Sequence, residues 1–345
     1  MAEIKKRDLG NSGLKVPALG LGTMTWGEKR LGYGKTFSFE DIFQVYQTCL
    51  DAGFNFFDTA AIYGKGESER LLGECYRRDG RQIIIATKVA PNSMLTPSIK
   101  RVCPHTTLEE LDRSLERLGV DCIDLYQLHM PPAKAKLDIY MDLLAKAVRV
   151  GKIRAIGVCN FTAPLIQQAH TRLASHGLTL ASAMVGYNLL RRNPENNGVL
   201  DTCRELNIAL IAYAPLAEGI LTGKYRSGTK KLPLSYKLLL YLEQLNLLKE
   251  TRHPLPILRR LFGKPPNTDF KRLEPLFLQM ETIANTHQKT IAQVAMNWLL
   301  SQDTHIITIP GAKNLRQLKE NIGTLGWQLT GEECALISQA EVSTL

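Results

Sequence analysis

Phe54–Gly73 reads FNFFDTAAIYGKGESERLLG and is the most informative stretch of this 345-residue chain. It begins as a short apolar run that suits a buried strand, and the run ends on an acidic side chain, Asp58. Tyr63 follows, before a glycine-bearing turn and the start of a helix. An aspartate and a tyrosine just past the end of a strand lie where a barrel enzyme carries its reactive groups.

Apolar runs of strand length alternate with helical stretches through the rest of the chain. We interpret as strands the runs Ala18–Thr23, Asn55–Asp58, Ile83–Lys88, Asp124–His129, Ala155–Cys159, Ala181–Tyr187, Ala209–Ala214 and His305–Pro310. Helical spacing occurs at Phe39–Ala52, Ser68–Arg78, Thr107–Leu118, Asp138–Val150, Pro164–His176, Pro194–Leu206, Phe270–Asn285, Ile291–Ser301 and Leu315–Leu325. Such alternation predicts parallel strands joined by right-handed crossovers. Because the expected strands number eight, the sequence favours an α/β fold of the (β/α)8 TIM-barrel type over an open doubly wound sheet.

Two segments depart from this alternation. Asn11-Ser12-Gly13 lies between two short extended stretches, which predicts an N-terminal β-hairpin before the first barrel strand. A long loop excursion follows the seventh strand, and residues 225–271 of it are basic and proline-bearing. We interpret this excursion as a lid or a partner surface inserted in a single domain that spans residues 1–345. A decoration without function is the alternative.

Composition restricts the class of protein. Hydrophobic residues make up 44% of the chain and charged residues 22%, which is ordinary for a globular protein. The net charge of +10 suits an anionic ligand, but the Lys and Arg residues are scattered and form no tract typical of nucleic-acid binding. The seven cysteines are dispersed without a CxxC pair, which favours reduced thiols. With no leader pattern and no metal-ligand spacing, we expect a cytoplasmic protein without membrane insertion or a metal site.

Reactive side chains follow three successive strands of the predicted barrel. Asp58 and Tyr63 follow the second strand, Lys88 ends the third after IIIAT, and His129 ends the fourth after DLYQL. In a parallel barrel these strand ends converge on one face. Each residue alone has an ordinary structural explanation, such as a turn cap for Asp58 or a snorkelling side chain for Lys88. Their combination on neighbouring strands favours a catalytic site.

The four side chains suit protonation of a carbonyl oxygen. A tyrosine acts as a general acid near neutral pH only if its phenolate is stabilised, because the unperturbed pKa of tyrosine is about 10. We expect the Lys88 ammonium to lower the pKa of Tyr63, and Asp58 to hold Lys88 in place. His129 would orient the substrate oxygen through a hydrogen bond while another group delivers hydride. The set does not suit acyl transfer, because no Ser or Cys nucleophile has a base assigned to it.

Several motifs together resemble the aldo-keto reductase superfamily. They extend from about Leu19 to Asn321 and read GLGTMTWG, FDTAAIYGKGESERLLG, IIIATKV, DLYQLHMP, GKIRAIGVCNF, YNLL, AYAPLAEGILTGKY and IPGAKNLRQLKEN. The resemblance implies a (β/α)8 barrel that reduces aldehydes or ketones with NADPH and binds it without a Rossmann domain. It also implies a catalytic tetrad, with Tyr63 as the proton donor, formed by Asp58, Tyr63, Lys88 and His129.

The same resemblance assigns residues to the substrate and the cofactor. Substrate contacts would come from Trp26, Tyr63 and His129. Asn160 would bond the nicotinamide carboxamide, and Tyr213 would stack on the nicotinamide ring. The other cofactor contacts would come from Gly22, Thr23, Met24, Asp58, Leu216, Gly219, Leu221, Lys224, Gly311, Lys313, Arg316, Gln317 and Asn321. Among these, Lys313 and Arg316 would supply the positive charge that a 2′-phosphate needs beside a helix N-terminus.

Two positions depart from the family pattern. Cys159 stands where a serine usually precedes the asparagine, and Met184 stands where many members place a carboxamide-binding glutamine. The loss of that glutamine removes a hydrogen bond worth about 1 kcal/mol. We therefore expect the nicotinamide to be bound more loosely, or to be positioned by Tyr213 and Asn160 alone.

Two functions of different classes fit these residues. The first is an NADPH-dependent oxidoreductase that reduces small or medium aldehydes and ketones, pyridoxal-like compounds included, with a proton from Tyr63. The alternative is an NADPH-binding sensor or regulatory subunit with little turnover, resembling potassium-channel β subunits, in which residues 225–271 would meet a partner. Nucleic-acid binding rests on net charge alone and is disfavoured.

Overall fold

The computed structural model describes residues 6–91, 104–226 and 273–340. The chain divides into two compact units, Met1–Pro215 with Met296–Gln328 and Leu216–Ala295 with Leu329–Leu345. Residues 227–272 lie outside the described part, so the role of the 225–271 excursion stays a prediction. Within the described ranges, no helix is long and apolar enough to cross a membrane.

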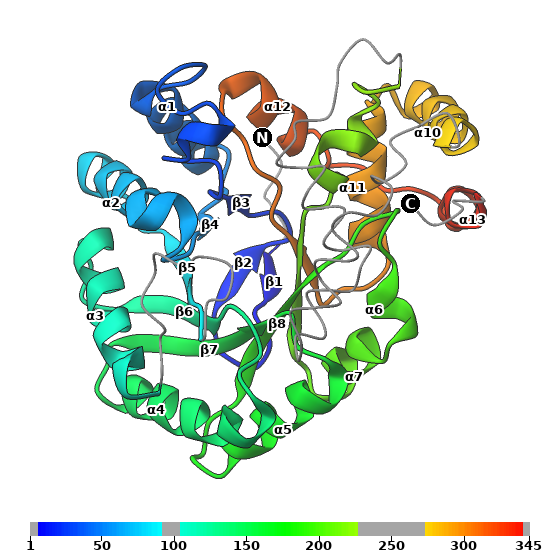
Figure 1. Cartoon of the computed structure of the whole chain (residues 1–345). Helices are drawn as coiled ribbons and strands as arrows, with labels where there is room; N and C mark the ends of the chain where they lie inside the picture. The colour runs from blue at the N-terminus through cyan, green and yellow to red at the C-terminus, as the bar shows by residue number, and fades with distance from the viewer. Residues whose placement is uncertain (1–5, 92–103, 227–272, 341–345) are drawn as a thin grey trace, which may run out of the picture. The chain divides into compact units, whose positions relative to one another are not determined.

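Eight parallel strands form the centre of the first unit, which confirms the predicted barrel fold (Figure 1). They are β3 (Leu21–Gly22), β4 (Phe56–Asp58), β5 (Ile84–Val89), β6 (Ile123–Leu128), β7 (Ile153–Cys159), β8 (Leu180–Gly186), β9 (Ala209–Tyr213) and β10 (Ile306–Thr308). Each strand pairs with the next in chain order. The first and last strands also meet, because Gly20 N donates to Thr308 O (2.8 Å) and Thr308 N donates to Ala18 O (2.9 Å). Backbone hydrogen bonds therefore close the sheet.

The pleat of the strands places the polar side chains of the site. Strand side chains alternate between the barrel interior and the surrounding helices. Phe56 of β4 and Ala86 of β5 belong to the buried apolar cluster that fills the interior. Two residues further along the same strands stand Asp58 and Lys88. The alternation that buries the apolar pair therefore brings the carboxylate and the ammonium to the same interior, at the carboxyl ends of the strands.

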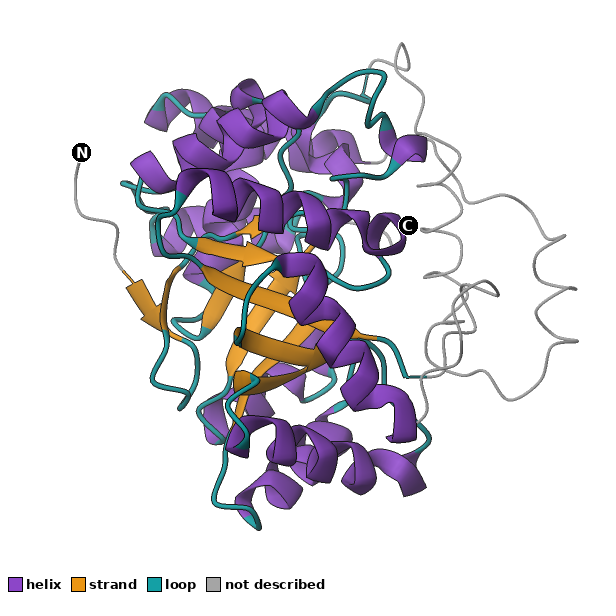
Figure 2. Cartoon of the chain, turned by 90° about the vertical axis from the view of Figure 1, so that its left-hand side faces the viewer, coloured by secondary structure: helices purple, strands orange, loops and turns teal. Residues whose placement is uncertain are grey.

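The predicted N-terminal hairpin is confirmed. Strands β1 (Lys6–Asp8) and β2 (Lys15–Pro17) pair antiparallel, and Figure 2 shows them beside one end of the barrel strands. Leu9 and Val16 are fully buried in the interior cluster. The turn needs a glycine at Gly10, where φ is +54° and a Cβ would come within 2.5 Å of the Ala181 carbonyl oxygen. The hairpin thus seals the end of the interior opposite the polar side chains.

Helices follow the strands of the first unit. They are α1 (Phe39–Asp51), α2 (Glu67–Asp79), α3 (Thr107–Leu118), α4 (Leu137–Arg149), α5 (Ala163–Ala174), α7 (Val199–Glu205) and α12 (Leu315–Ile322). In α1 the buried residues are Ile42, Val45, Tyr46 and Cys49, a spacing that lines one face of a helix. A capping box between Ser38 and Asp41 fixes where α1 begins. Short 3₁₀ turns occur at η1 (Lys29–Leu31), η3 (Pro104–Thr106) and η4 (Lys134–Lys136).

Two helical assignments differ from the sequence prediction. The single helix expected over Pro194–Leu206 is wrong, because the chain forms α6 (Asn193–Asn196) and then α7. Gly198 between them has a φ of +77°, a left-handed conformation that no helix residue adopts. The structure also adds α13 (Gly331–Gln339), which begins at a capping box between Thr330 and Glu333.

The second unit holds η5 (Ala217–Thr222), α10 (Glu274–His287), α13 and the start of α11 (Ile291–Ser301). The Arg226 guanidinium forms ion pairs with Glu274 and Glu281, so it ties the segment after η5 to α10. His287 Nε2 lies 2.8 Å from Glu333 Oε1, which joins α10 to α13. This unit therefore has its own polar contacts.

Candidate active site

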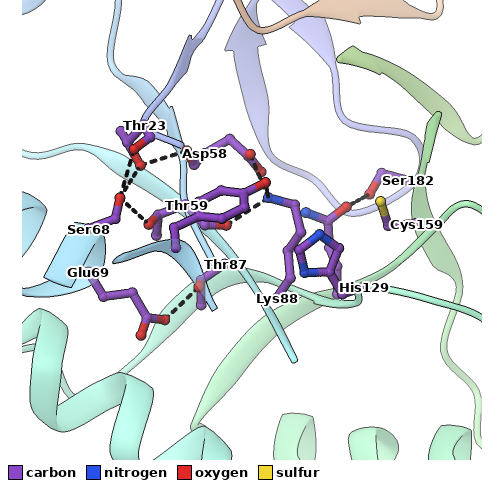
Figure 3. Close-up of polar contacts among 12 residues, drawn as sticks. Thr23, Asp58, Thr59, Ser68, Glu69, Thr87, Lys88, His129, Cys159 and Ser182 are labelled. Carbon is purple, nitrogen blue, oxygen red and sulfur yellow. Dashed lines mark hydrogen bonds and ion pairs between the residues drawn. The ribbon is translucent and has the colours of Figure 1, made fainter. Parts of the chain in front are cut away.

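All four members of the predicted tetrad lie together in the first unit, and Figure 3 labels three of them, Asp58, Lys88 and His129. Lys88 Nζ donates to Asp58 Oδ2 (2.6 Å), to the carbonyl oxygen of Thr59 (2.7 Å) and to the Tyr63 hydroxyl (3.3 Å). The rings of Tyr63 and His129 meet edge to face with centroids 5.8 Å apart. A buried ammonium thus links the carboxylate to the phenol, and the imidazole lies beside the phenol.

Burial and the Asp58–Lys88 pair decide the charges of the tetrad. Burial is the largest single effect on Lys88 and lowers its pKa, but Asp58 and the neighbouring Tyr63 and Cys159 together raise it by more, so the net pKa is above its ordinary value and Lys88 is an ammonium. Burial, with Lys88 adding to it, lowers the pKa of His129 to about 3, so the imidazole is neutral at physiological pH. Burial raises the pKa of Tyr63 to about 12 although Lys88 lowers it. The prediction of a lowered Tyr63 pKa is therefore wrong in its net direction, because desolvation of the phenolate outweighs the nearby ammonium.

The turn that carries Tyr63 has an unusual backbone. Within η2 (Tyr63–Gly66), Gly64, Lys65 and Gly66 have φ values of +54°, +59° and +89°. A Cβ at Gly66 would also come within 2.7 Å of Arg117 Cδ. Glycine at 66 therefore allows both the left-handed conformation and the close approach of the arginine that covers the turn.

A buried ion pair holds this turn and the neighbouring strand. The carboxylate of Glu69, in the first turn of α2, has no exposed surface and accepts from Arg117 Nε at 2.5 Å. Its other oxygen accepts from Thr87 Oγ1 at 2.6 Å, and Thr87 directly precedes Lys88 (Figure 3). Arg117 also donates to Ser114 Oγ at 3.0 Å. The Glu69–Arg117 pair thus connects α2, α3 and β5 behind the tetrad.

A cluster of buried hydroxyl groups supports the strand ends from the same side (Figure 3). Ser68 Oγ donates to Thr23 O (2.9 Å), accepts from Thr59 Oγ1 (3.0 Å) and lies 2.8 Å from Thr23 Oγ1. Thr23 N and Oγ1 both lie within 3.0 Å of Asp58 O. The first loop, the end of β4 and the start of α2 are therefore joined. The backbone that presents Asp58 and the Thr59 carbonyl to Lys88 is fixed.

Replacement of Glu69 by Gln should lower the free energy of unfolding by roughly 3 kcal/mol, because the mostly buried Arg117 then lacks its carboxylate. Urea denaturation followed by circular dichroism measures the loss. Glu74→Gln is the matched control on the same helix, since Glu74 pairs with Arg77 and Arg78 on the surface. An equal loss of stability in both variants would show that the buried pair has no special role.

The residues expected at the nicotinamide also meet. Tyr213 OH donates to Asn160 Oδ1 at 2.9 Å, and Asn160 Nδ2 lies 3.2 Å from the His129 carbonyl oxygen and 3.2 Å from Cys159 Sγ. Asn160 has a φ of +62°, which turns its side chain toward these partners. Met184 is buried in the interior cluster and pairs with Cys159 across the ladder. The two positions that depart from the family pattern are thus neighbours.

The first loop and the segment 310–321 lie side by side. Gly22 and Gly311 form a parallel bridge. Lys313 Nζ donates to the Leu31 carbonyl oxygen at 2.7 Å, and burial lowers the pKa of Lys313. Gln317 Oε1 accepts from Lys313 N, and Asn321 Nδ2 donates to Gly311 O. Arg316 and Met24 are exposed, whereas Lys313, Gln317 and Asn321 form the hydrogen bonds given above.

Trp26 has no exposed surface, and its indole N–H donates to Ala312 O at 3.0 Å. This bond fixes the first loop against the segment that begins at Gly311. A contact between Trp26 and substrate stays a prediction.

The remaining predicted cofactor residues, Leu216, Gly219, Leu221 and Lys224, form one turn around η5 in the second unit. Ala217, Glu218 and Gly219 all have positive φ, and a Cβ at Gly219 would overlap the Lys224 ammonium. Successive residues in such conformations turn their backbone N–H groups toward a common side, and the lysine adds positive charge there. The chemistry of this turn suits a phosphate group.

Comparison with known proteins decides the family. The profile of the Aldo/keto reductase family matches residues 18–342. The chain belongs to this family of oxidoreductases. The aldo-keto reductase yakc [NADP(+)] of Schizosaccharomyces pombe is 32% identical over 344 residues, covering 98% of this chain and 91% of that protein. A pyridoxal reductase of Arabidopsis thaliana, named chloroplastic, is 34% identical over 335 residues, covering 93% and 82%.

Solved aldo-keto reductases have the same fold. A thermostable aldo-keto reductase in complex with the inhibitor epalrestat superposes with a TM-score of 0.70 at 27% identity, over 97% of this chain and 99% of that chain. A glycerol dehydrogenase of Gluconobacter oxydans superposes with a TM-score of 0.75 at 26% identity, over 98% and 94%. These likenesses extend over the barrel that carries the tetrad.

Sequence reasoning missed the groups that support the tetrad of this aldo-keto reductase. Ser68 and Glu69 stand in the quoted motif GESERLLG, but two polar residues at a helix start look solvent-exposed in a sequence. Arg117 comes from the next helix, 48 residues later. No group of three or more His, Cys, Asp or Glu that could hold a metal ion occurs in the part of the chain that the structure describes.

Proposed function

We propose that this aldo-keto reductase uses NADPH to reduce aldehyde or ketone carbonyls to alcohols, with Tyr63 as the proton donor. The observation that carries the proposal is the buried Lys88 ammonium, which lies 2.6 Å from Asp58 Oδ2 and 3.3 Å from the Tyr63 hydroxyl. A phenol in contact with an ammonium can release its proton to a developing alkoxide, because the ammonium stabilises the phenolate that forms.

Residues of the first unit suit parts of NADPH. In the first unit the Asn160 amide and the half-buried Tyr213 ring suit the nicotinamide, and Lys313 with Arg316 suits a 2′-phosphate. Taken by itself, the turn at Gly219 with Lys224 in the second unit suits a phosphate group. NADPH, when bound, supplies the hydride that reduces the carbonyl carbon. The relative from Schizosaccharomyces pombe is named for NADP(+), which supports this choice of cofactor.

Each member of the tetrad has a separate task in this proposal. Tyr63 gives its proton to the carbonyl oxygen, which becomes the alcohol oxygen. Lys88 stays an ammonium and stabilises the resulting phenolate across the 3.3 Å contact. Asp58 holds Lys88 in position through the 2.6 Å bond. His129 is neutral, so its ring can hydrogen-bond the carbonyl oxygen without competing as an acid.

Loss of the nicotinamide absorbance of NADPH in the presence of aldehydes tests the proposal. The panel includes benzaldehyde and pyridoxal, since one relative is named a pyridoxal reductase. We expect turnover that depends on both protein and aldehyde. Failure to oxidise NADPH or NADH with any aldehyde, while the protein remains folded, would refute a reductase function.

Lys313→Ala and Arg316→Ala should each weaken the binding of NADPH by roughly 10-fold, because each removes a charge-assisted bond to the 2′-phosphate. The affinity for NADH should hardly change, since NADH lacks that phosphate. Quenching of intrinsic fluorescence by the two cofactors measures both dissociation constants. Lys319 lies in the last turn of α12, the helix that contains Arg316. Lys319→Ala is therefore the control and should alter neither dissociation constant. Equal losses for NADPH and NADH would assign the two residues to another part of the cofactor.

The alternative of an NADPH sensor subunit has no specific support, because its expected partner surface lies almost wholly outside the described residues. The cytoplasm stays our expected compartment. The relative from Arabidopsis thaliana is named for the chloroplast, so the family is not confined to one location.

A further inference from the structure

A buried glutamine lies beside the tetrad inside the barrel. Gln127 stands on β6, two residues before His129, and has no exposed surface. Its register partner on β5 is Lys88. Leu125, two residues earlier on β6, belongs to the interior cluster. Because strand side chains alternate with a period of two, Gln127 also faces the interior, in the same layer as Lys88.

The neighbouring strand leaves room for this side chain. Gly157 of β7 pairs with Gln127 on one side and with Ser182 of β8 on the other. A Cβ at Gly157 would overlap Ser182 Oγ and lie 2.9 Å from Gln127 Cγ. Across this gap the Ser182 hydroxyl lies 3.5 Å from Gln127 Oε1, to which it can donate. The oxygen end of the amide is therefore directed toward β8.

The nitrogen end of the amide and one oxygen of Asp58 both lack a close hydrogen bond. Within the residues that the structure describes, neither Gln127 Nε2 nor Asp58 Oδ1 has a partner at hydrogen-bond distance, although both atoms are buried. The other carboxylate oxygen, Asp58 Oδ2, accepts from Lys88 Nζ at 2.6 Å. A buried polar atom without a partner is costly. One of the two atoms is a donor and the other an acceptor, so each supplies what the other needs.

Gln127 is near enough to Asp58 to affect its charge. Burial raises the pKa of the Asp58 carboxyl, and Lys88 opposes this rise most. The Gln127 amide, as a hydrogen-bond donor, also lowers that pKa. The two side chains are thus within reach of one another, and a small rotation of the amide would form the full hydrogen bond.

A hydrogen bond to Asp58 acts on Tyr63 through Lys88. A carboxylate with a bare oxygen in an apolar interior is more basic, so it takes a larger share of the proton that it holds in common with Lys88. A donor on Asp58 Oδ1 disperses the carboxylate charge instead. More of the ammonium charge then remains for the Tyr63 hydroxyl, which lies 3.3 Å from Lys88 Nζ.

The other titratable groups beside the Asp58–Lys88 pair carry no charge at neutral pH. Burial lowers the pKa of His129 to about 3, so its imidazole is neutral. Burial raises the pKa of Tyr63 and that of the Cys159 thiol to about 12. The balance between one carboxylate and one ammonium therefore decides how well the phenolate of Tyr63 is stabilised.

We propose that Gln127 is a positioning residue of this enzyme, whose amide donates to Asp58 Oδ1 during the proton transfer. The carboxylate then holds Lys88 as an ammonium, and the ammonium stabilises the Tyr63 phenolate. Gln127 acts through Asp58 and not on the reacting atoms. This inference rests on the proposed reductase function, because it concerns the acidity of the proton donor.

Gln127→Met tests this role, because methionine has a similar volume and an apolar end that suits the interior. We expect kcat for aldehyde reduction with NADPH to fall about 10-fold, the effect of one lost hydrogen bond to a charged group. The KM values for NADPH and aldehyde should hardly change, since Gln127 is fully buried. Urea denaturation should show nearly the stability of the wild type, since the replaced amide lacks a close partner.

Two more variants show whether Gln127 acts through the carboxylate. In an Asp58→Asn background, Gln127→Met should change kcat less than about 2-fold, because no carboxylate remains to receive the hydrogen bond. Gln127→Glu gives an independent readout even if Asp58→Asn folds poorly. A buried carboxyl beside a carboxylate stays protonated near neutral pH and can donate to Asp58. The kcat of Gln127→Glu, relative to the wild type, should therefore be near normal at neutral pH and fall as the introduced carboxyl ionises.

Gln168→Met is the matched control. Gln168 on α5 donates to Asp138 Oδ1 at 2.9 Å on the surface, so its loss removes a glutamine–aspartate contact far from the tetrad layer. This variant should leave kcat unchanged.

Three results would overturn the inference. One is a folded Gln127→Met enzyme with the kcat of the wild type. Another is an equal loss in the wild-type and Asp58→Asn backgrounds, together with a pH-independent loss in Gln127→Glu, which would assign Gln127 to packing. A wild type that reduces no aldehyde would refute the reductase function itself, whereas a wild type that turns over beside an equally fast Gln127→Met would refute only the role of Gln127.

Discussion

Tyr63→Phe should reduce kcat for carbonyl reduction by about 10²- to 10⁴-fold, the usual contribution of a positioned general acid. Phenylalanine keeps the ring that packs on His129 but removes the hydroxyl that accepts from Lys88 Nζ. The fold should persist, because Lys88 still bonds to Asp58 and to the Thr59 carbonyl. Steady-state kinetics with NADPH and an aldehyde measure the loss.

Cofactor binding separates a catalytic role of Tyr63 from a structural one. The dissociation constant of NADPH in Tyr63→Phe should match the wild type, because the missing hydroxyl serves the substrate oxygen. Tyr33→Phe is a suitable control, since Tyr33 lies in the loop before α1 and packs on Phe37. It should keep normal turnover. A Tyr63→Phe enzyme as fast as the wild type would remove the basis of the proposed mechanism.

Lys88→Met should have the second large effect, on stability as well as turnover. The variant leaves the Asp58 carboxylate buried without its ammonium, which costs roughly 3–5 kcal/mol of unfolding free energy. Turnover should also be lost, because no cation remains to stabilise the phenolate of Tyr63. Urea denaturation and steady-state kinetics measure the two losses.

A second substitution and a pH series isolate the cause of the instability. Lys88→Met with Asp58→Asn leaves no unpaired charge at these two positions, so it should regain most of the stability while turnover stays lost. Burial raises the pKa of Asp58, and Lys88→Met removes the ammonium that opposes this effect. The folded variant then binds a proton more tightly than the unfolded chain, so its stability deficit should shrink as the pH falls. The stability deficit of Lys88→Met could instead be the same with Asp58→Asn and at every pH. That result would mean that lost packing, and not the unpaired charge, destabilises the protein.

The meeting of the tetrad was predictable from sequence because it depends on topology alone. Asp58, Lys88 and His129 follow successive strands, and the strands of a parallel barrel present their carboxyl ends on one face. The hairpin was predictable from the local turn Asn11-Ser12-Gly13, since its geometry needs no distant partner. Both features depend on the spacing of residues along the chain, which can be read from a single sequence.

Features that depend on burial or distant partners could not be predicted. The net pKa of Tyr63 is set by desolvation, which only the packed structure determines. The role of Glu69 requires Arg117 on another helix. The break between α6 and α7 at Gly198 is different, because it could have been predicted. Asn197-Gly198 is a turn signal in the sequence, but the helical spacing of the residues around it favoured one continuous helix.

Deuterium transfer from NADPH labelled at C4 of the nicotinamide tests the central claim most directly. The labelled cofactor is incubated with the wild type and benzaldehyde, and the alcohol is analysed by mass spectrometry and NMR. If hydride passes from the nicotinamide to the carbonyl carbon, the carbinol carbon carries one deuterium from one of the two C4 epimers. Failure to form alcohol, or alcohol without deuterium from either epimer, would contradict the account.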